Sequence, residues 1–302
     1  MAGSRVAVIG LGSMGLGMAR SLKRAGMDVV GADVSAERRA AFAADGGQVA
    51  ESAAAAAAGA EVAVCVVITG DQTEAVLFGP GGVAGALPRD AIFISCATMP
   101  PRQAEALGRR AAEAGLRFLD APISGGARNA EIGALTIMAS GARATWEAAQ
   151  PVLSAMGQRL FWLGEEPGQG SAMKAVNQLL AGVNLSTACE AITFAIRLGL
   201  DPKTVHEIIS GSAGNSWMWG DRISALVAGD YTPRSAVDIF TKDLGIVVDT
   251  ARANNFPVPM AGAALQNFLM AAAAGLGREA DFSVARVYAR LAGLELPKPA
   301  ND

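Results

Sequence analysis

Histidine and cysteine are scarce in this chain of 302 residues, which contains one histidine, His206, and three cysteines. So few of these side chains cannot assemble the usual zinc sites, which draw three or four ligands mainly from these residue types. The cysteines are odd in number and lie in apolar surroundings, which excludes a disulfide framework and indicates reduced thiols. We therefore expect no metal site and a cytoplasmic location.

Aromatic residues and runs of basic residues are also scarce. Aromatics make up 5% of the chain, the net charge is -3, and no run of Lys or Arg occurs. Nucleic-acid bases would find little to stack on, and neither phosphate backbones nor anionic lipids would be attracted. The start of the chain lacks the pattern of a signal peptide, and apolar stretches such as 62–68 are too short to cross a bilayer. We expect neither a nucleic-acid nor a membrane partner.

The first half of the chain alternates short, continuously apolar runs with helical patterns. Strands are predicted at 5–9, 28–32, 61–67, 91–94 and 116–119. Helices are predicted at 14–25, 36–44, 53–58 and 101–114. Continuous apolar runs are typical of parallel strands that are covered on both faces. The alternation therefore predicts an α/β fold with a doubly wound sheet over residues 1–164.

Beyond residue 164 the strand pattern stops, and helical patterns punctuated by proline follow. Helices are predicted at 168–198, 202–210, 217–228, 237–254, 261–274 and 280–292. This composition predicts an all-α domain over residues 165–296 and a loose tail over 297–302. A cleft between the two domains is the natural place for an active site. The many apolar helices indicate association into a homodimer or homotetramer.

A glycine-rich motif of the form G-x-G-x-x-G follows the first predicted strand and precedes the first predicted helix. It consists of Gly10, Leu11, Gly12, Ser13, Met14 and Gly15. In this context Gly10 makes a tight turn, Gly12 admits a pyrophosphate, and Gly15 lets the helix pack on the strand. The helix N-terminus then faces the phosphates. A glycine-rich turn without a ligand is the alternative.

An acidic residue, Asp33, ends the second predicted strand. At this distance from the turn, about 20 residues, such a side chain accepts hydrogen bonds from the adenosine ribose. It would repel the additional phosphate of NADP, so we expect NAD as the cofactor. Arg38 and Arg39 follow and could reach that phosphate, although solvated surface charge is the simpler interpretation.

A lysine is the best candidate for the group that takes a proton from a substrate hydroxyl. His206 has no acidic partner at an obvious spacing, and neither tyrosine has a lysine four residues later. Lys174 lies near the start of a long predicted helix among small apolar neighbours, which would desolvate its ammonium. Asn177 follows on the same face, and Gly170, one turn earlier, is expected to leave room for a ligand. A solvated lysine is the alternative.

A second glycine-rich segment, residues 120–126, follows the strand predicted at 116–119. Its Ser124 hydroxyl and the exposed N–H groups of Gly125 and Gly126 would form a small cradle for a carboxylate. The expected position at the carboxyl edge of the sheet is where α/β proteins bind ligands. An ordinary Ser-Gly-Gly turn is the alternative.

Four motifs in this order resemble the β-hydroxyacid dehydrogenase family, which includes 3-hydroxyisobutyrate dehydrogenase and tartronate semialdehyde reductase. The resemblance covers residues 6–294 and rests on 10–15, 120–126, Gly170 with Lys174 and Asn177, and 240–244. It implies a Rossmann domain, an all-helical oligomerisation domain and oxidation of a small hydroxy acid by hydride transfer. It also implies a catalytic Lys174 assisted by Asn177. By the same resemblance, Ser124, Gly125 and Gly126 hold the substrate carboxylate, and Lys242 lies near the nicotinamide.

The second half is most similar to the L-threonate dehydrogenase branch of the family, through residues 213–218 and 229–240. This resemblance implies oxidation of L-threonate with NAD to a 2-oxo acid. Asn215 and Ser216 would suit a substrate with several hydroxyls, although they could equally cap the next helix. The family often has a Ser-Thr pair where this chain has Ala97-Thr98. Thr98 keeps the hydroxyl expected beside the nicotinamide, whereas Ala97 lacks the hydroxyl of the serine.

Two alternatives remain open. The same chemistry could act on 3-hydroxyisobutyrate, tartronate semialdehyde or glyoxylate. The chain could also be an NAD-binding module without turnover, although such a protein would have no use for a buried lysine facing the cofactor.

Overall fold

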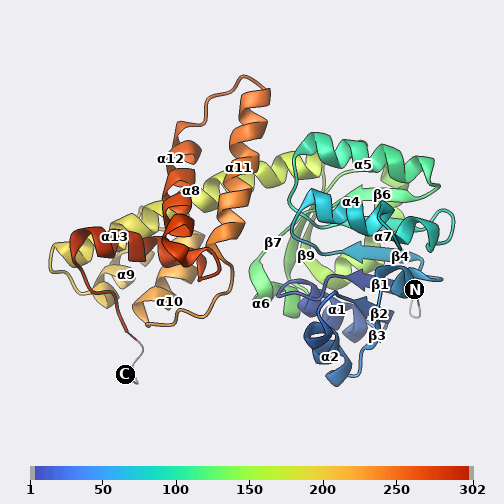
Figure 1. The fold of residues 1–302 in the computed structure, drawn as a ribbon, viewed down its shortest axis with the longest axis horizontal. Helices are drawn as coiled ribbons and strands as arrows, with labels where there is room; N and C mark the ends of the chain where they lie inside the picture. The colour runs from blue at the N-terminus through green and yellow to red at the C-terminus, as the bar shows by residue number, and fades with distance from the viewer. Residues whose placement is uncertain (1–3, 299–302) are drawn as a thin grey trace. The chain divides into compact units, whose positions relative to one another are not determined.

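The computed structural model describes residues 4–298 of the chain (Figure 1). It divides into two compact units, one ending at Lys174 and the other beginning at Ala175. The division falls within a single helix, whereas the sequence pattern places the domain boundary after residue 164. The difference arises because the first turn of that helix packs against the strands of the first unit, as the site contacts show.

A six-stranded parallel sheet forms the centre of the first unit. Its strands are β1 (Arg5–Ile9), β2 (Asp28–Ala32), β3 (Gln48–Ala50), β4 (Val62–Cys65), β5 (Ile92–Ser95) and β6 (Arg117–Asp120). They are arranged in the order β3-β2-β1-β4-β5-β6. The order reverses between β1 and β4, and such a reversal marks the ligand site of a Rossmann fold. The predicted doubly wound sheet is confirmed.

Helices cover both faces of this sheet because successive strand residues point to opposite sides. One face packs against α1 (Gly15–Arg24), α2 (Ala36–Ala44), α6 (Gly126–Glu131) and α7 (Arg143–Met156). The other packs against α3 (Ala53–Ala57), α4 (Gly70–Phe78), η1 (Val83–Gly85) and α5 (Pro101–Glu113). In β1, Val6 and Val8 enter the first cluster, whereas Ala7 and Ile9 enter the second.

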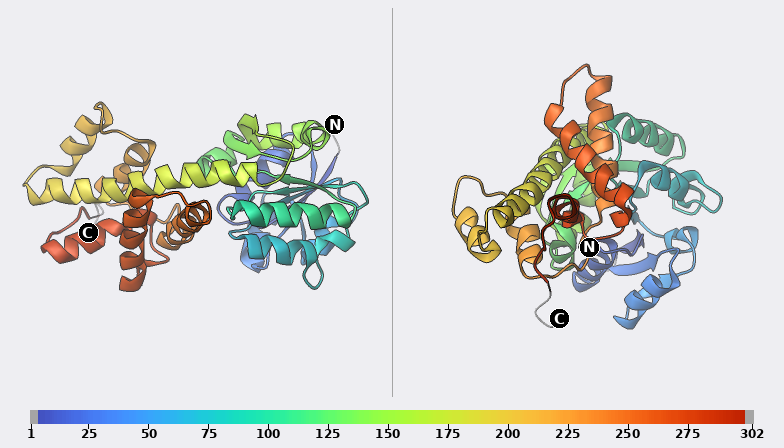
Figure 2. Two further views of the ribbon diagram at one scale, coloured as in Figure 1. Left: turned by 90° about the horizontal axis from the view of Figure 1, so that it is seen from above. Right: turned by 60° about the vertical axis from the view of Figure 1, so that its left-hand side comes forward.

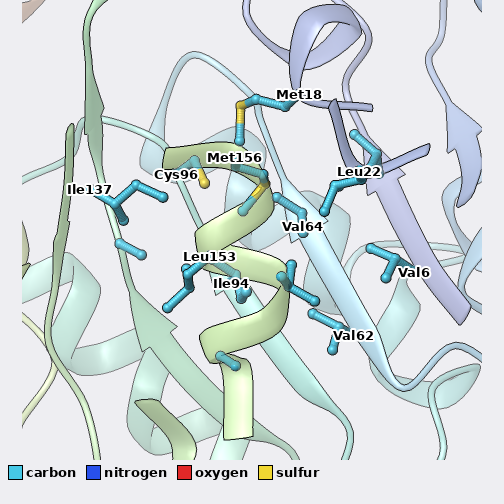
Figure 3. Packing of buried hydrophobic residues seen from close by; sticks show 14 of the residues in the cluster. Val6, Met18, Leu22, Val62, Val64, Ile94, Cys96, Ile137, Leu153 and Met156 are labelled. Carbon is cyan, nitrogen blue, oxygen red and sulfur yellow. The ribbon is translucent and has the colours of Figure 1, made fainter. Parts of the chain in front are cut away.

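The first of these clusters is drawn in Figure 3, where side chains of the strands meet those of α1 and α7. Met18 of α1 and Leu153 of α7 lie over the sheet, and both are fully buried. Val64 of β4 and Ile94 of β5 are likewise buried beneath them. This apolar contact fixes α1, whose first residue follows the cofactor motif, against the sheet.

A second, three-stranded sheet was not predicted from the sequence. It consists of β7 (Ile123–Ser124), β8 (Leu135–Ala139) and β9 (Gly157–Trp162) in that order. Strand β7 is only two residues long, and β9 is largely exposed, so neither presents a continuous apolar run. A bridge between Asp120 and Ser140 links the end of β6 to this sheet.

The elements that follow β9 within the described residues are all helical. They are α8 (Gln169–Arg197), α9 (Pro202–Ser210), α10 (Ser224–Val227), α11 (Val237–Ala253), α12 (Pro259–Ala271) and α13 (Val284–Ala292). Short π and 3-10 segments join them: η2 (Trp219–Ile223), η3 (Ala272–Leu276) and η4 (Asp281–Ser283). In this unit α8 and α11 approach closely at Gly182, where a Cβ would lie 2.8 Å from the Leu244 side chain. The predicted all-helical region is confirmed.

Helix α8 is the longest element, with 29 residues, and runs unbroken in both views of Figure 2. By length and composition alone it is apolar enough to cross a membrane, which the search for apolar stretches in the sequence did not anticipate. This is a weak indication, because the core helix of a water-soluble protein passes the same test. The helix also carries the buried Lys174 near its start.

Two smaller expectations concern the tail and the thiols. The expected loose tail falls partly outside the described residues, and inside them the Pro297 carbonyl accepts a hydrogen bond of 2.9 Å from the Tyr231 hydroxyl.

All three cysteines are free and buried, as predicted. Burial raises the pKa of the Cys65 thiol to about 12, so this thiol stays protonated and unreactive at neutral pH.

Candidate functional site

The cofactor motif forms the turn between β1 and α1, and its three glycines meet different surroundings. Gly10 has a φ of +95°, and a Cβ there would lie 2.3 Å from the Val66 carbonyl oxygen. A Cβ at Gly15 would lie 1.8 Å from the Gly10 carbonyl oxygen. At Gly12, however, a Cβ would meet no protein atom nearer than 3.7 Å, in the Arg38 guanidinium. The turn thus leaves open the position where a pyrophosphate would approach.

The side chain of Asp33 lies at this turn, as its predicted role requires. Its carboxylate accepts hydrogen bonds from the Leu11 N–H at 2.7 Å and from the Ser35 N–H at 2.8 Å. The Arg38 guanidinium lies 3.6 Å from the same carboxylate. Arg39 instead donates to the Asp33 carbonyl oxygen at 2.6 Å. A carboxylate offers about four acceptor positions, so the ribose hydroxyls could still find acceptors here.

The segment predicted to cradle a carboxylate forms a turn between β7 and α6. Gly125 and Gly126 adopt φ values of +132° and +74°, a region that glycine enters without strain. A Cβ at Gly126 would meet no atom within 4 Å, so this side of the turn is open. The first N–H groups of a helix have no acceptor within it, and together with the Ser124 hydroxyl they provide donors for an anion.

Lys174 lies beside this turn and is only 8% exposed. Its amine donates a hydrogen bond of 2.7 Å to the carbonyl oxygen of Ile123, the residue that precedes Ser124. The structure therefore places the Lys174 amine beside the turn at Ser124, whereas the sequence suggested the lysine and the turn separately. The alternative of a solvated lysine on a helix surface is contradicted by this burial.

The start of α8 is bound to a buried carboxylate that we did not single out from the sequence. Asp120, with no exposed surface, accepts hydrogen bonds from the Gly168 N–H at 2.9 Å and the Ser171 N–H at 2.8 Å. The Ser171 hydroxyl donates a third, of 2.7 Å. Burial raises the pKa of the Asp120 carboxyl, and these donors oppose that rise. In the sequence Asp120 is the first residue of the segment 120–126, in which we gave a role only to Ser124, Gly125 and Gly126.

The expectation that Gly170 leaves room for a ligand is wrong. A Cβ at Gly170 would lie 2.5 Å from the Met138 carbonyl oxygen and 2.6 Å from that of Asp120. Protein backbone therefore occupies this space. Glycine is needed here because α8 approaches the ends of two strands closely, which the sequence alone cannot distinguish from space kept for a ligand.

In the second unit, Asn177 and Lys242 belong to one polar chain. Asn177 donates to the Gln178 side-chain oxygen at 2.8 Å, and Gln178 donates to Asp243 at 2.5 Å. The Lys242 amine lies 2.6 Å from the other oxygen of Asp243. Two predicted site residues are thus linked through Gln178 and Asp243, which sequence reasoning passed over because burial is not visible in a single sequence.

The remaining predicted residues have local partners. The Asn215 amide donates to the Ser210 carbonyl at 2.9 Å, and the Ser216 hydroxyl accepts from the Trp219 N–H at 3.1 Å. The Ser216 contact caps the next helix, as the structural alternative expects. Asn215 instead contacts Ser210, the last residue of the preceding helix α9. Thr98 is half-buried in the segment that follows β5. A substrate role for Asn215 and Ser216 and a nicotinamide contact for Thr98 stay predictions.

The helices that leave the two glycine-rich turns pack on each other. A Cβ at Gly17 of α1 would lie 2.7 Å from the Glu131 nitrogen of α6. Around this contact, the Arg20 and Arg24 guanidinium groups lie 3.1 and 3.2 Å from the Glu131 carboxylate. The cofactor turn (residues 10–15) and the turn at residues 124–126, where the sequence predicts a substrate carboxylate and which we call the substrate turn, are therefore linked through the contact between α1 and α6.

Within residues 4–298, no group of three or more His, Cys, Asp or Glu side chains could hold a metal ion. His206 stacks on Trp219 with 6.0 Å between ring centroids, so its ring packs within the helical unit.

Comparisons with known proteins agree with this arrangement along nearly the whole chain. Residues 5–164 match the NAD binding domain of 6-phosphogluconate dehydrogenase, and residues 168–288 match the NAD-binding domain of NADP-dependent 3-hydroxyisobutyrate dehydrogenase. L-threonate dehydrogenase of Cupriavidus necator is 47% identical over 98% of both chains. The L-threonate dehydrogenase of Escherichia coli (strain K12) is 42% identical over 97% of this chain and 96% of its own.

A solved structure shows the same fold. The crystal structure of a 3-hydroxyisobutyrate dehydrogenase from Salmonella typhimurium has 41% sequence identity and a TM-score of 0.90, and the match covers 94% of this chain and 99% of that one. The resemblance inferred from four motifs is confirmed. This protein belongs to the 3-hydroxyisobutyrate dehydrogenase-like family and is an NAD-dependent β-hydroxyacid dehydrogenase.

Proposed function

We propose that this protein oxidises L-threonate to its 2-oxo acid with NAD, and that Lys174 is the general acid–base. The observation that carries the substrate is the 47% identity to the Cupriavidus necator L-threonate dehydrogenase over 98% of both chains. The observation that carries the lysine is its buried amine, bonded to the Ile123 carbonyl beside Ser124.

In this proposal separate residues bind the cofactor, bind the substrate and transfer the proton. When bound, NAD supplies the acceptor for the hydride that leaves the carbinol carbon. Gly12 and the start of α1 hold the pyrophosphate, and the Asp33 carboxylate accepts hydrogen bonds from the ribose hydroxyls. The turn at Ser124 holds the substrate carboxylate. Lys174, as the neutral amine, takes the proton of the substrate hydroxyl, and in the reverse direction its ammonium returns that proton to the alkoxide.

The preference for NAD follows from Asp33, which would face the additional phosphate of NADP. Arg38, 3.6 Å from that carboxylate, weakens the repulsion without removing it. We expect a higher kcat/KM with NAD than with NADP. Comparison of the two cofactors at saturating hydroxy acid tests this preference, and an equal or reversed ratio contradicts it.

A second candidate substrate is 3-hydroxyisobutyrate, because the Salmonella typhimurium structure of that name is 41% identical to this chain. A panel of L-threonate, 3-hydroxyisobutyrate, tartronate semialdehyde and glyoxylate, assayed through NADH absorbance, decides between them by the highest kcat/KM. Binding of NADH without turnover of any member would favour a non-catalytic NAD-binding module.

The lysine is tested by Lys174→Ala. Loss of a general acid–base costs about 10²–10⁴-fold in rate, so we expect kcat to fall by that factor while the Kd for NADH stays within about twofold of the wild-type value. Lys203→Ala on α9 is the matched control, because Lys203 is exposed. Near-normal kcat in Lys174→Ala would show that another group moves the proton.

We further propose that the protein is a cytoplasmic homo-oligomer, a dimer or tetramer, associating through its helical unit. Large apolar side chains are exposed there: Leu180 by 56%, Phe194 by 62% and Met260 by 62%. Exposed apolar surface of this kind is typical of protein–protein contacts. Sedimentation analysis should give a dimer or tetramer for the wild type and a smaller species for Phe194→Glu; a wild-type monomer would contradict the proposal.

A further inference from the structure

The buried carboxylate of Asp120 has no part in the proton transfer proposed above. Its side chain has no exposed surface, and its oxygens accept hydrogen bonds from the first turn of α8 and from the Ser140 hydroxyl. Burial of a carboxylate is unfavourable unless donors compensate for lost water. A serine hydroxyl also caps a helix, so the carboxylate at this position must do something that a hydroxyl cannot.

The Asp120 carboxylate accepts several hydrogen bonds from the start of α8 at once. Gly168 N–H and Ser171 N–H both donate to one oxygen, and the Ser171 hydroxyl donates to the other. A hydroxyl has too few acceptor positions, and too little reach, for this arrangement. The backbone of Asp120 is itself fixed, because it exchanges hydrogen bonds of 3.0 and 2.8 Å with Ser140.

The contact of Lys174 repeats this arrangement one helical turn further on. Asp120 binds Ser171, and Ile123, three residues after Asp120, accepts the hydrogen bond of Lys174, three residues after Ser171. Residues 120–123 and the start of α8 are thus joined by hydrogen bonds at two places, which we call ties: the first at Ser171 and the second at the Lys174 amine. The second tie lies directly beside Ser124, where the substrate carboxylate is proposed to bind.

Close backbone packing supports the same alignment. Gly170, which lies between Gly168 and Ser171, lets α8 approach the carbonyl oxygens of Met138 and Asp120 to a distance that no Cβ would permit. The Gly170 N–H also donates to the Ser140 hydroxyl at 2.9 Å. A shift of the first turn of α8 would therefore be carried directly to the position of the Lys174 amine.

We propose that Asp120 is a positioning residue, which sets the place of the Lys174 amine relative to the turn at Ser124 by anchoring the first turn of α8. The inference rests on the proposed role of Lys174. It assigns to a carboxylate with no exposed surface a specific effect on the rate of proton transfer.

The test compares Asp120→Ala with Asp120→Asn, assayed with the hydroxy acid that the substrate panel identifies. Displacement of a reacting group by about 1 Å can cost roughly 10²-fold in rate. We expect Asp120→Ala to lower kcat by about 10–100-fold, with little change in the KM for the hydroxy acid or the Kd for NADH. Asp120→Asn should recover most of kcat, because one amide oxygen can still accept both N–H groups.

Two controls separate this effect from a general loss of stability and from failure of the lysine mechanism. Asp281→Asn removes an equally buried carboxylate, which is paired with Arg222, and should leave the kcat of the folded protein near the wild-type value. Lys174→Ala, measured in parallel, tests the lysine itself. A slow Lys174→Ala with a normal Asp120→Ala would overturn only the positioning role; a normal Lys174→Ala would overturn the function proposed for the lysine.

A readout that does not depend on turnover completes the experiment. Amide hydrogen exchange of residues 168–174 should accelerate in Asp120→Ala and return toward the wild-type rate in Asp120→Asn, while the rest of α8 changes less. If Asp120→Ala does not fold, Ser140→Ala combined with Ser171→Ala removes hydroxyl contacts only and should give a smaller loss of kcat. Unchanged exchange, or an Asp120→Asn variant as slow as Asp120→Ala, would overturn the proposal.

Discussion

The two glycine-rich turns of the first unit use glycine for different reasons. In the cofactor turn, Gly10 and Gly15 are required because neighbouring backbone occupies the place of a Cβ, and Gly10 has a positive φ in addition. In the substrate turn, Gly126 has open space around it, and its positive φ is what requires glycine. Gly12 meets neither condition, so its small size is best explained by a ligand. One residue type thus reports packing, backbone conformation or ligand approach, depending on what surrounds it.

The largest effect should follow from Gly15→Ala. Its Cβ would lie 1.8 Å from the Gly10 carbonyl oxygen, so the start of α1 would have to move away from β1. Overpacking against backbone should cost more than about 3 kcal/mol. Denaturant unfolding measures this loss. Wild-type stability of the variant would show that the turn can relax and that packing does not explain this glycine.

A smaller and more selective effect is expected from Gly12→Ala. Its Cβ would meet only ordinary contacts, so unfolding free energy should stay within about 0.5 kcal/mol of wild type. The methyl group would obstruct the pyrophosphate, which should raise the Kd for NADH by about 10–100-fold. Fluorescence titration with NADH checks this prediction. Comparison with Gly15→Ala separates the ligand role of one glycine from the packing role of the other.

Gly126→Ala should combine a moderate strain with a substrate effect. A left-handed conformation costs a non-glycine residue about 1–2 kcal/mol, and the substrate turn should lose some of its shape. We expect a higher KM for the hydroxy acid and an unchanged Kd for NADH. Gly26→Ala is the matched control, because Gly26 has a φ of +85° and equally open space. An increase of KM in both variants would argue against a specific role for Gly126.

The smallest effect concerns the pH dependence of stability near the substrate turn. Burial raises the folded-state pKa of Asp120 above its unfolded value. The stabilisation associated with its protonated form is therefore present below the unfolded pKa, about 4, and is lost as pH rises through the folded pKa. Relative to Asp120→Asn, the wild type should lose stability over this range. Unfolding of both proteins at several pH values checks the sign, and a wild type that gains stability would contradict it.

The sequence predicted the central sheet well because its strands are continuous apolar runs. The predicted strands at 5–9 and 28–32 coincide with β1 and β2, and the prediction at 168–198 differs from α8 by one residue at each end. The second sheet escaped prediction, since β9 is mostly exposed and α7, beside it, contains Pro151. Exposed strands and an internal proline weaken the patterns on which such predictions depend.

Site residues could be predicted where neighbouring residues in the sequence form a recognisable motif, and not where the role depends on distant contacts. Residues that belong to a local motif, such as Gly12 and Ser124, could be proposed because neighbouring residues reveal the turn. Asp120 belongs to the same segment as Ser124, but its role could not be proposed, because that role comes from burial and from donors about 50 residues away along the chain. Gly170 was misread for the same reason: an absent side chain shows that space matters, but not which group fills it.

The contact at Gly17 has a consequence for redesign of this enzyme. Because α1 begins at the cofactor turn and rests on α6, which begins at the substrate turn, a tilt of either helix displaces both recognition loops together. If the turn at Ser124 binds the acid as proposed, a change in α1 that alters cofactor selectivity should also alter selectivity for the acid. Exchange of α1 alone with that of a relative should disturb the acid preference as well, whereas a graft that carries both helices should transfer the two traits as one piece.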